Sequence, residues 1–349
     1  MIQALTSFRF LFMLLIVLFH LIGKRFEFGG DCGVAFFFML SGFVLSLGYG
    51  KQVAEGSFEI FPFVKRQLAK FYPLHLLMLV LIALLDARLE RYYEWYQLLP
   101  SVLLLQSWFP FDSIIHVANA SSWFLCALLF SYILFPLLFR LLSGLSIKRL
   151  MLLSVGTLVI YAVIISIVPE SKINNVVCLS PALRVLDFCI GILLFRLFAS
   201  QYGKSFGSWL KGRSSWQLTI IEVLPLCLVL LSYFVYGAIS PRLRCASLFW
   251  ITLPPLFLVY AKADQLKGKA CTLLHNPVLL WLGSISMEIY LTHGLTIRLC
   301  GFVARYLEWC EDEPDIFLQS LYVPIIILVA YGFHRWFVQP VQQLVCRFK

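Results

Sequence analysis

The sequence predicts an all-α integral membrane protein, a bundle of about ten transmembrane helices with no separate soluble domain. Of its 349 residues, 61% are hydrophobic and only 13% carry a charge, whereas soluble globular proteins average roughly 25% charged residues. A chain this apolar cannot cover a water-facing surface, which excludes a soluble enzyme. A hydrocarbon core about 30 Å thick takes roughly 20 apolar residues per helical crossing. Ten crossings would therefore fill most of residues 1–349 as a single domain.

Apolar windows bounded by charged residues, proline or glycine place the ten helices along the chain. They are expected at residues 5–22, 32–48, 71–87, 121–142, 149–168, 183–200, 217–237, 242–261, 277–300 and 318–340. The segment 95–109 is also apolar, but it is short and contains Pro100. Such a segment is typical of a re-entrant or interfacial element rather than a crossing.

Basic residues predict the orientation, because cytoplasmic loops carry an excess of lysine and arginine. With the N-terminus in the cytoplasm, 17 basic residues fall on the cytoplasmic side and 10 on the other. This distribution favours cytoplasmic N- and C-termini. It also explains much of the net charge of +10 as a consequence of membrane topology, so membrane lipids are expected partners and nucleic acid is not. No small-x-small site follows the first helix, which we expect to stay in the protein rather than be cleaved as a signal peptide.

Metal binding is not expected from the cysteines and histidines. The six histidines are far apart, with no H-x-x-x-H pattern, and the ten cysteines form no C-x-x-C pair. Structural and catalytic zinc sites depend on such spacings.

Two ionisable residues of the first helix, Arg9 and His20, share one face. They are eleven residues apart, which at about 100° per residue places them roughly 20° from alignment and about 16 Å apart along the axis. Polar groups at membrane depth are costly and are functional candidates by default. The alternative, which the sequence leaves equally open, is that Arg9 reaches the headgroups and His20 is an interfacial histidine.

The ninth helix, in the segment SISMEIYLTH, adds His293 and Glu288. His293 is predicted to lie at a depth similar to that of His20, which favours the functional interpretation. Glu288 lies about one turn deeper and does not share the helix face of His293. It is expected either to face a cavity or to bond to a neighbouring helix.

A basic run, FVKRQLAKFYPLHLL, is expected between the second and third helices on the cytoplasmic side. Arg66 and Lys70 are four residues apart and share a face if the run is helical, with Lys65 adjacent. The run is either ordinary positive-inside charge or a clamp for the phosphates of an anionic cofactor, since clustered cations are what phosphates require.

Four segments resemble the membrane-bound acyltransferase 3 family, and they follow in the family's order. Arg9 and His20 in LTSFRFLFMLLIVLFH match its Arg-x10-His, and GVAFFFMLSGFVLS is similar to its G-V-x-x-F-F-x-L-S-G-F. The run KRQLAKFYPL resembles its R-R-x-x-R-x-x-P, and SISMEIYLTH its late S-x-x-I-Y-L-x-H. Ten helices is also the family's pattern, so the resemblance covers the chain from the first helix to the tenth.

The chain departs from the family pattern at four positions. Gln67 and Lys70 stand where arginine is common, which weakens a bidentate clamp. Leu128 and Leu129 occupy positions where some members carry paired carboxylates, so no catalytic acid can be transferred there. The attached soluble domain of some relatives is not expected, because the chain ends soon after the tenth helix.

The resemblance implies acyl transfer in the bacterial cytoplasmic (inner) membrane, from cytoplasmic acyl-CoA, most often acetyl-CoA, to a hydroxyl of an envelope polysaccharide, oligosaccharide or lipid-linked glycan. The cofactor-binding residues implied are Arg9, Lys65, Arg66 and Lys70. His20 is the predicted general base, with His293 and Glu288 as further catalytic candidates. An acyl-histidine intermediate is the variant mechanism, and the acyl group, the acceptor sugar and the oligomeric state stay open.

Other functions compete with this interpretation. A transporter or flippase for an envelope glycan or lipid would also use intramembrane Arg, Glu and His, although the internal repeats of many carriers are missing. A purely structural membrane subunit would tolerate loss of Arg9 and His20. Ser41 is a weak candidate nucleophile, because its surroundings are not a strained strand-to-helix turn; close helix packing at Ser-Gly is the simpler interpretation.

Overall fold

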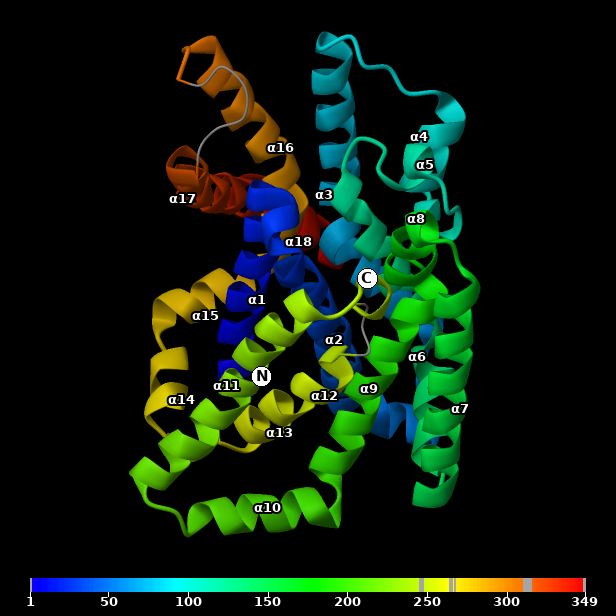
Figure 1. The fold of residues 1–349 in the computed structure, drawn as a ribbon, viewed down its shortest axis with the longest axis vertical. Coiled ribbons are helices and arrows are strands. Elements are labelled where there is room, and N and C mark those ends of the chain that lie inside the picture. The colour runs from blue at the N-terminus through cyan, green and yellow to red at the C-terminus, as the bar shows by residue number, and fades with distance from the viewer. Residues whose placement is uncertain (1, 245–247, 264–265, 267, 310–315, 348–349) are drawn as a thin grey trace.

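The protein is a bundle of helices that surround α1 and α2 in the computed structural model (Figure 1), which describes residues 2–244, 248–263, 266, 268–309 and 316–347. No strand occurs in these residues. The α-helices are α1 (Gln3–Ile22), α2 (Glu27–Glu55), α3 (Ile60–Arg88), α4 (Trp95–Val102), α5 (Asp112–Ile115), α6 (Trp123–Gly144), α7 (Ile147–Ile167), α8 (Glu170–Ile173), α9 (Pro181–Ala199), α10 (Gln201–Lys211), α11 (Ser215–Ala238), α12 (Phe249–Thr252), α13 (Pro254–Ala263), α14 (Lys269–Leu274), α15 (Pro277–Ser284), α16 (Ser286–Tyr306), α17 (Ile316–Phe333) and α18 (Gln339–Arg347). Short 3₁₀ or π turns join some of them: η1 (Gly23–Phe26), η2 (Gln106–Trp108), η3 (Ala120–Ser122), η4 (Asn174–Cys178), η5 (Pro241–Leu243) and η7 (His334–Val338).

The helices confirm an integral membrane protein, but they do not reach the predicted count of ten. Seven helices of the described residues are long and apolar enough to cross a membrane, and two bent pairs raise the number to nine. The eighth predicted helix, 242–261, is divided into η5, α12 and α13, and its apolar part is a shorter helix. The ten-helix count and the cytoplasmic position of both termini stay predictions.

The third helix is longer than the sequence predicted, and this changes the place of the basic run. The run was expected between helices, yet α3 begins at Ile60 and carries it within its first three turns. Pro62 does not prevent this, because the first turn of a helix has no internal partner for the missing N–H. The basic side chains therefore project from a helix at fixed angles.

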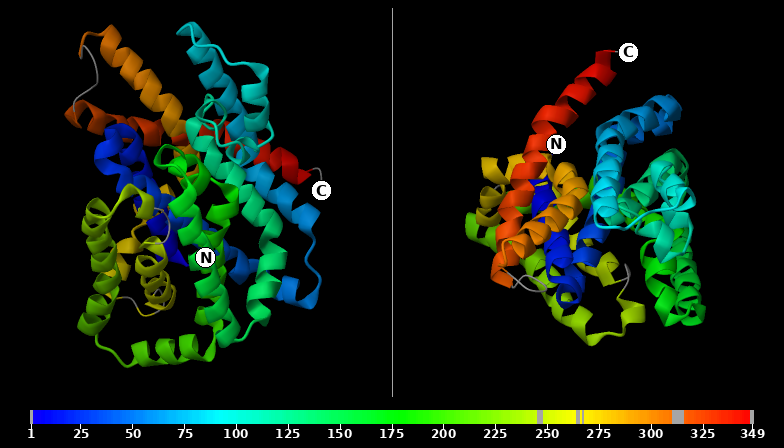
Figure 2. Two further views of the ribbon diagram at one scale, coloured as in Figure 1. Left: turned by 45° about the vertical axis from the view of Figure 1, so that its right-hand side comes forward. Right: turned by 90° about the horizontal axis from the view of Figure 1, so that it is seen from above.

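The predicted ninth helix, 277–300, is broken, which the sequence did not indicate. α15 and α16 meet at Ile285 with a bend of 68°. The Ser284 hydroxyl donates to the Trp281 carbonyl at 2.6 Å, and such a side-chain bond competes with the helical ladder. The predicted tenth helix, 318–340, in contrast lies within one continuous span, Ile316–Leu344, in which the π turn η7 joins α17 to α18. The C-terminal end of this span extends away from the bundle (Figure 2).

The segment 95–109 is too short to cross a membrane, as the sequence predicted. It forms α4 and the turn η2 and packs on α3. The Tyr72 hydroxyl donates to the Val102 carbonyl at 2.9 Å, and His75 Nε2 lies 2.9 Å from the Ser101 carbonyl oxygen. His75 is fully buried, so this contact lies inside the bundle.

Close helix crossings hold the centre of the bundle together. A Cβ atom on Gly42 of α2 would lie 2.1 Å from the Phe188 carbonyl oxygen of α9, and one on Gly191 would lie 2.0 Å from the Met39 carbonyl oxygen. Only glycine allows backbones to approach this closely, and such packing drives helix association where lipid removes the hydrophobic driving force.

The first helix separates a packed face from an open one. Phe8 and Phe12 belong to the core formed with α2 and α13, and the rings of Phe12 and Phe36 stack at 4.0 Å. The other face of α1 looks toward α3, α6 and α16, and there a cavity remains. This arrangement directs the stripe that contains Arg9 into the interior.

Candidate active site

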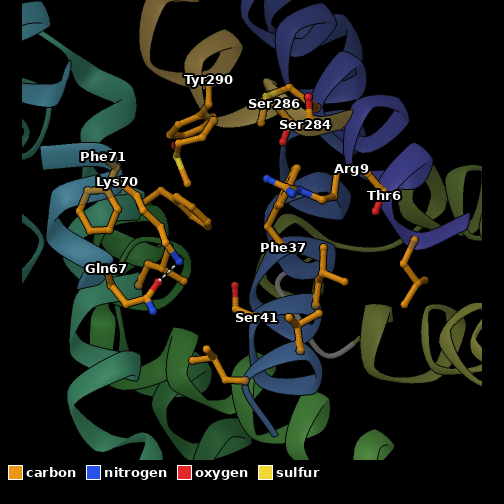
Figure 3. A pocket seen from close by; sticks show the side chains of 18 of the residues that line it. Thr6, Arg9, Phe37, Ser41, Gln67, Lys70, Phe71, Ser284, Ser286 and Tyr290 are labelled. Carbon is orange, nitrogen blue, oxygen red and sulfur yellow. Dashed lines mark hydrogen bonds between the residues drawn. The ribbon is translucent and has the colours of Figure 1, made fainter. Parts of the chain in front are cut away.

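A cavity of about 430 Å³ lies between α1, α2, α3, α6 and the bend from α15 to α16 (Figure 3). This volume is in the range of small-molecule sites, roughly 300–1,000 Å³. Its polar lining residues come from these helices and from α18: Thr6, Arg9, Ser41, Gln67, Lys70, Tyr132, Ser284, Ser286, Glu288, Tyr290 and Gln342. The rest of the wall is largely apolar, and it includes Leu128 at one of the positions where some relatives carry a carboxylate.

Two cations approach the cavity from different walls. Arg9 projects from α1 and Lys70 from α3, with the cavity between them (Figure 3). The Lys70 Nζ donates to Gln67 Oε1 at 3.0 Å, so Gln67, which stands where the family commonly has arginine, steadies the lysine. Neither cation forms a salt bridge within the described residues. An anionic group between them would meet two positive charges.

The Ser286 hydroxyl has no hydrogen-bond partner, although it is buried in the cavity wall. Its oxygen lacks any partner in the described part of the chain, and the residue is 1% exposed. An unpaired buried hydroxyl costs free energy. Ser286 is therefore available to a ligand in the cavity, whereas the half-buried Ser41, which also lines it (Figure 3), is hydrogen-bonded to Tyr132.

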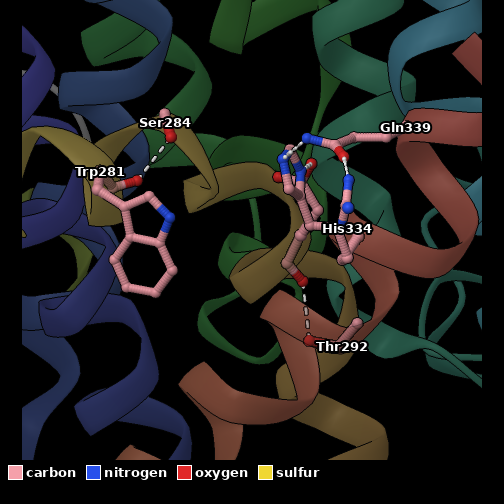
Figure 4. A network of polar contacts seen from close by, with 7 residues as sticks. Trp281, Ser284, Thr292, His334 and Gln339 are labelled. Carbon is pink, nitrogen blue, oxygen red and sulfur yellow. Dashed lines mark hydrogen bonds and ion pairs between the residues drawn. The ribbon is translucent and has the colours of Figure 1, made fainter. Parts of the chain in front are cut away.

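Glu288 both lines the cavity and bonds to a neighbouring helix, which satisfies the two alternatives that the sequence left open. Its Oε1 accepts from His334 Nδ1 at 2.7 Å, and Gln339 Nε2 donates to His334 Nε2 at 3.0 Å. Arg335 in turn donates to Gln339 Oε1 at 3.2 Å. These hydrogen bonds link the four side chains in one continuous network, with His334 and Gln339 in its middle (Figure 4). It fixes a single carboxylate beside the two cations, so the charged groups of the cavity wall stay positive on balance.

The face of α1 that carries Arg9 continues toward His20. Arg9, Met13 and Ile16 line the cavity, and His20 is the next position of the same stripe at helical spacing. The ring of His20 lies beyond the cavity wall and contacts the ring of His293, with 4.7 Å between the ring centroids. We call the cavity around Arg9, Lys70 and Glu288 the arginine end, and the cluster of His20, His293 and Ser121 the histidine end.

Hydrogen bonds define the tautomers at the histidine end. His20 Nδ1 lies 2.8 Å from the Ile16 carbonyl oxygen, to which it must donate, because a carbonyl only accepts. Its Nε2 therefore keeps a lone pair, and no group of the described residues hydrogen-bonds to it. An imidazole in this state can accept a proton.

His293 is fully buried, and both of its nitrogens are engaged. Nδ1 donates to the Tyr290 carbonyl at 2.6 Å, so Nε2 accepts from the Ser121 hydroxyl at 3.2 Å. The ring is thus fixed in position against His20 and has no free lone pair. This geometry favours His20 as the proton acceptor and His293 as the residue that orients it.

The structure brings together most, but not all, of the residues that the sequence singled out. Arg9, Lys70 and Glu288 meet at the arginine end, whereas His20 and His293 meet at the histidine end. Arg66 is exposed and lines a separate pocket of about 270 Å³ with Gln52, Ser57, Phe58, Glu59 and Pro62. Lys65 is exposed and lines neither pocket.

Sequence reasoning missed Ser121, His334 and Tyr132. Ser121 and His334 bond to residues 172 and 46 positions away, and no spacing in the sequence indicates such pairs. Tyr132 lies in an apolar helix whose pattern is explained by packing. No group of three or more His, Cys, Asp or Glu in the described residues could hold a metal ion.

Comparisons with known proteins place the whole bundle among acyltransferases. A family model described as an acyltransferase domain matches residues 2–335. Acyltransferase MdmB of Streptomyces mycarofaciens is 29% identical over 289 residues, which cover 77% of this chain and 68% of that protein. Protein 2 in the picA locus of Rhizobium radiobacter is 48% identical over 50 residues, 14% of this chain and 26% of that protein. No solved structure matches.

Proposed function

The chain belongs to the acyltransferase-domain family, and from that premise we propose that it transfers an acetyl group from cytoplasmic acetyl-CoA to a hydroxyl of an envelope polysaccharide, oligosaccharide or lipid-linked glycan. One observation carries the proposal. A single stripe of α1 presents Arg9 to a cavity and, at its far end, His20 to a second imidazole. The stripe joins a site for an anion to a site for proton transfer.

The arginine end suits the donor. CoA carries several phosphate charges, and Arg9 and Lys70 offer it two cations from opposite walls. Arginine binds phosphate in a bidentate way, whereas lysine acts as a point charge. Arg66, one turn of α3 before Lys70, and the exposed Lys65 would extend this positive surface toward the part of the nucleotide outside the cavity.

The length of the stripe fits an extended donor arm. Eleven residues separate Arg9 from His20, which corresponds to about 16 Å along the helix axis. With the phosphates near Arg9, a pantetheine arm laid along Met13 and Ile16 brings the thioester toward His20. Ser286 lines the same cavity, its hydroxyl has no partner among the described residues, and it would bond to the polar groups of the arm.

His20 supplies the chemistry in this proposal. Its Nε2 accepts the proton of the acceptor hydroxyl while that oxygen attacks the thioester carbonyl carbon, forming a C–O bond. The C–S bond then breaks, and the imidazolium returns the proton to the leaving sulfur, so that CoA leaves as the thiol. Positioned general-base catalysis of this kind typically contributes about 10²- to 10⁴-fold.

Purified protein in liposomes with radiolabelled acetyl-CoA and an extract of envelope glycans tests the proposal. The protein should release CoA and transfer label to the glycan, and the variant His20→Gln should lose transfer. Full transfer by His20→Gln would reject His20 as the base. Movement of the glycan across the liposome membrane without acetyl transfer would instead favour a transporter or flippase.

A further inference from the structure

A short loop from Asp112 to Ser122 lies beside the histidine end and presents one exposed histidine. Ile115, Val117 and Ala118 of this loop are buried at 2% exposure or less. His116 lies among them in the sequence, yet its side chain is 38% exposed. Three buried anchors around one exposed imidazole indicate that the loop is built to hold that ring at the surface.

The backbone of this loop is held in a strained conformation at Ala118. Its φ is +50°, in the left-handed region that non-glycine residues rarely adopt. Arg298 Nη2 donates to the Ala118 carbonyl at 3.0 Å, and Arg298 Nη1 bonds to both oxygens of the buried Asp86, at 2.7 and 2.5 Å. Strain of this kind persists only where the surroundings over-determine it and is frequent at functional sites.

The C-terminal part of the loop is hydrogen-bonded to α16 next to His293. Asn119 Nδ2 donates to the Leu291 carbonyl at 3.1 Å, and the Ser121 hydroxyl bonds to His293. The Tyr290 hydroxyl donates to the Ser121 carbonyl at 2.6 Å. The loop and the imidazole pair are therefore one rigid unit.

His116 is paired with a carboxylate that is itself fixed. Its Nε2 lies 3.7 Å from Asp112 Oδ1, and Asn175 Nδ2 donates to the same oxygen at 2.9 Å. The loop that carries His116 also carries Ser121, whose hydroxyl bonds to His293, and the His293 ring contacts the ring of His20. The Asp112–His116 pair thus belongs to a loop that is joined to the histidine end, where His20 Nε2 keeps a free lone pair.

We infer that Asp112 and His116 bind the hydroxyl-bearing acceptor and direct its reacting hydroxyl to His20 Nε2. This inference rests on the proposed function. Carboxylate oxygens accept from sugar hydroxyls and an imidazole can both donate and accept, so the pair would hold neighbouring hydroxyls of one sugar. His116 is a specificity-determining residue in this account, because it contacts the acceptor, whereas Arg298 and Asp86 are positioning residues.

The protonation state of His116 agrees with this role. Partial burial lowers the pKa of His116 below its ordinary value, and the Asp112 carboxylate acts in the opposite direction. The ring is therefore neutral at neutral pH and keeps both a donor and an acceptor. His116 can therefore donate a hydrogen bond to the acceptor and accept one from it, while the reacting hydroxyl gives its proton to His20.

Transfer kinetics of His116→Gln and Asp112→Asn in liposomes test the inference, with acetyl-CoA as donor and extracted envelope glycan as the titrated acceptor. Each variant should raise the apparent KM for glycan about tenfold, as expected for losing a hydrogen bond to a charged or strongly polar group. The KM for acetyl-CoA should stay unchanged. His275→Gln is the matched control, because His275 follows the last residue of α14 and lines neither pocket.

A second variant separates binding from folding. Ala118→Gly removes the left-handed strain without removing a side chain of the site, so the protein should fold, yet the freer loop should raise the KM for glycan. Normal glycan kinetics in His116→Gln and Asp112→Asn, beside an inactive His20→Gln, would overturn the inference and leave the proposed function intact. Equal rises in both KM values would also overturn it. If the unsubstituted protein transfers no acetyl group at all, the proposed function fails and this inference with it.

Discussion

The two ends of the α1 stripe are organised in opposite ways. At the arginine end, Arg9 and Lys70 face an open cavity without salt bridges in the described chain, and Ser286 has no partner. At the histidine end, each nitrogen of His293 is bonded and the rings are packed in contact. Unsatisfied groups around a void are what a binding site requires, whereas close packing and fixed tautomers are what proton transfer requires. Substitutions at the two ends should therefore change different kinetic parameters.

After the loss of transfer in His20→Gln, the largest effect is expected at the same end, from His293→Ala. Removing the ring that orients His20 should lower turnover by about 10²-fold, near the lower limit of positioned general-base catalysis, and leave the KM for acetyl-CoA unchanged. Steady-state transfer in liposomes measures both. A raised KM for acetyl-CoA with normal turnover would show that the two ends are not separate in function.

At the arginine end, Arg9→Gln should act on donor binding. Losing a charge-assisted bond to phosphate should raise the KM for acetyl-CoA by about 10- to 100-fold, since such bonds contribute about 1.5–3 kcal/mol. Arg9→Lys should recover part of this loss, because the charge returns without the bidentate geometry. An unchanged KM for acetyl-CoA in Arg9→Gln would show that the phosphates do not bind at the arginine end.

Lys70 and Lys65 provide a matched pair on α3. Lys70 lines the cavity and Lys65 does not, so Lys70→Ala should raise the KM for acetyl-CoA by up to about tenfold and Lys65→Ala much less. Equal effects would mean that the whole basic run acts as a diffuse positive surface. Salt dependence of the KM separates the cases further, because exposed charges are screened at high ionic strength.

The smallest effect is expected from Ser286→Ala. Loss of one neutral hydrogen bond to the donor should raise the KM for acetyl-CoA by about two- to tenfold, corresponding to roughly 0.5–1.5 kcal/mol. The fold should be unaffected, because the hydroxyl bonds to no group in the described part of the protein. A Tm measurement on the same variant checks this, and a lower Tm would indicate a hidden structural bond.

The sequence predicted what depends on local pattern. The first helix was predicted to within two residues of its observed start and end, and the shared face of Arg9 and His20 follows from helical geometry alone. The common depth of His20 and His293 required only helix direction and residue counting. The contact between their rings depends on how α1 and α16 pack, and residue counting does not predict it.

Features that depend on tertiary contacts could not be predicted. The break at Ile285, directly after Gly283 and Ser284, places Ser286 and Glu288 in the cavity wall. The sequence did not predict the start of α3 at Ile60. Its first turns contain charged residues, and apolar windows identify only the uninterrupted apolar part of a membrane helix. His116 and His334 gain their significance from residues on other helices, which a single sequence does not reveal.

Equilibrium binding of radiolabelled acetyl-CoA to the purified protein tests the separation of the two ends most directly. The unsubstituted protein, Arg9→Gln and His20→Gln are compared under the same conditions. Binding by His20→Gln should stay within about twofold of the unsubstituted protein although transfer is lost, and binding by Arg9→Gln should weaken about tenfold or more. Loss of binding in His20→Gln, or normal binding in Arg9→Gln, would contradict this account.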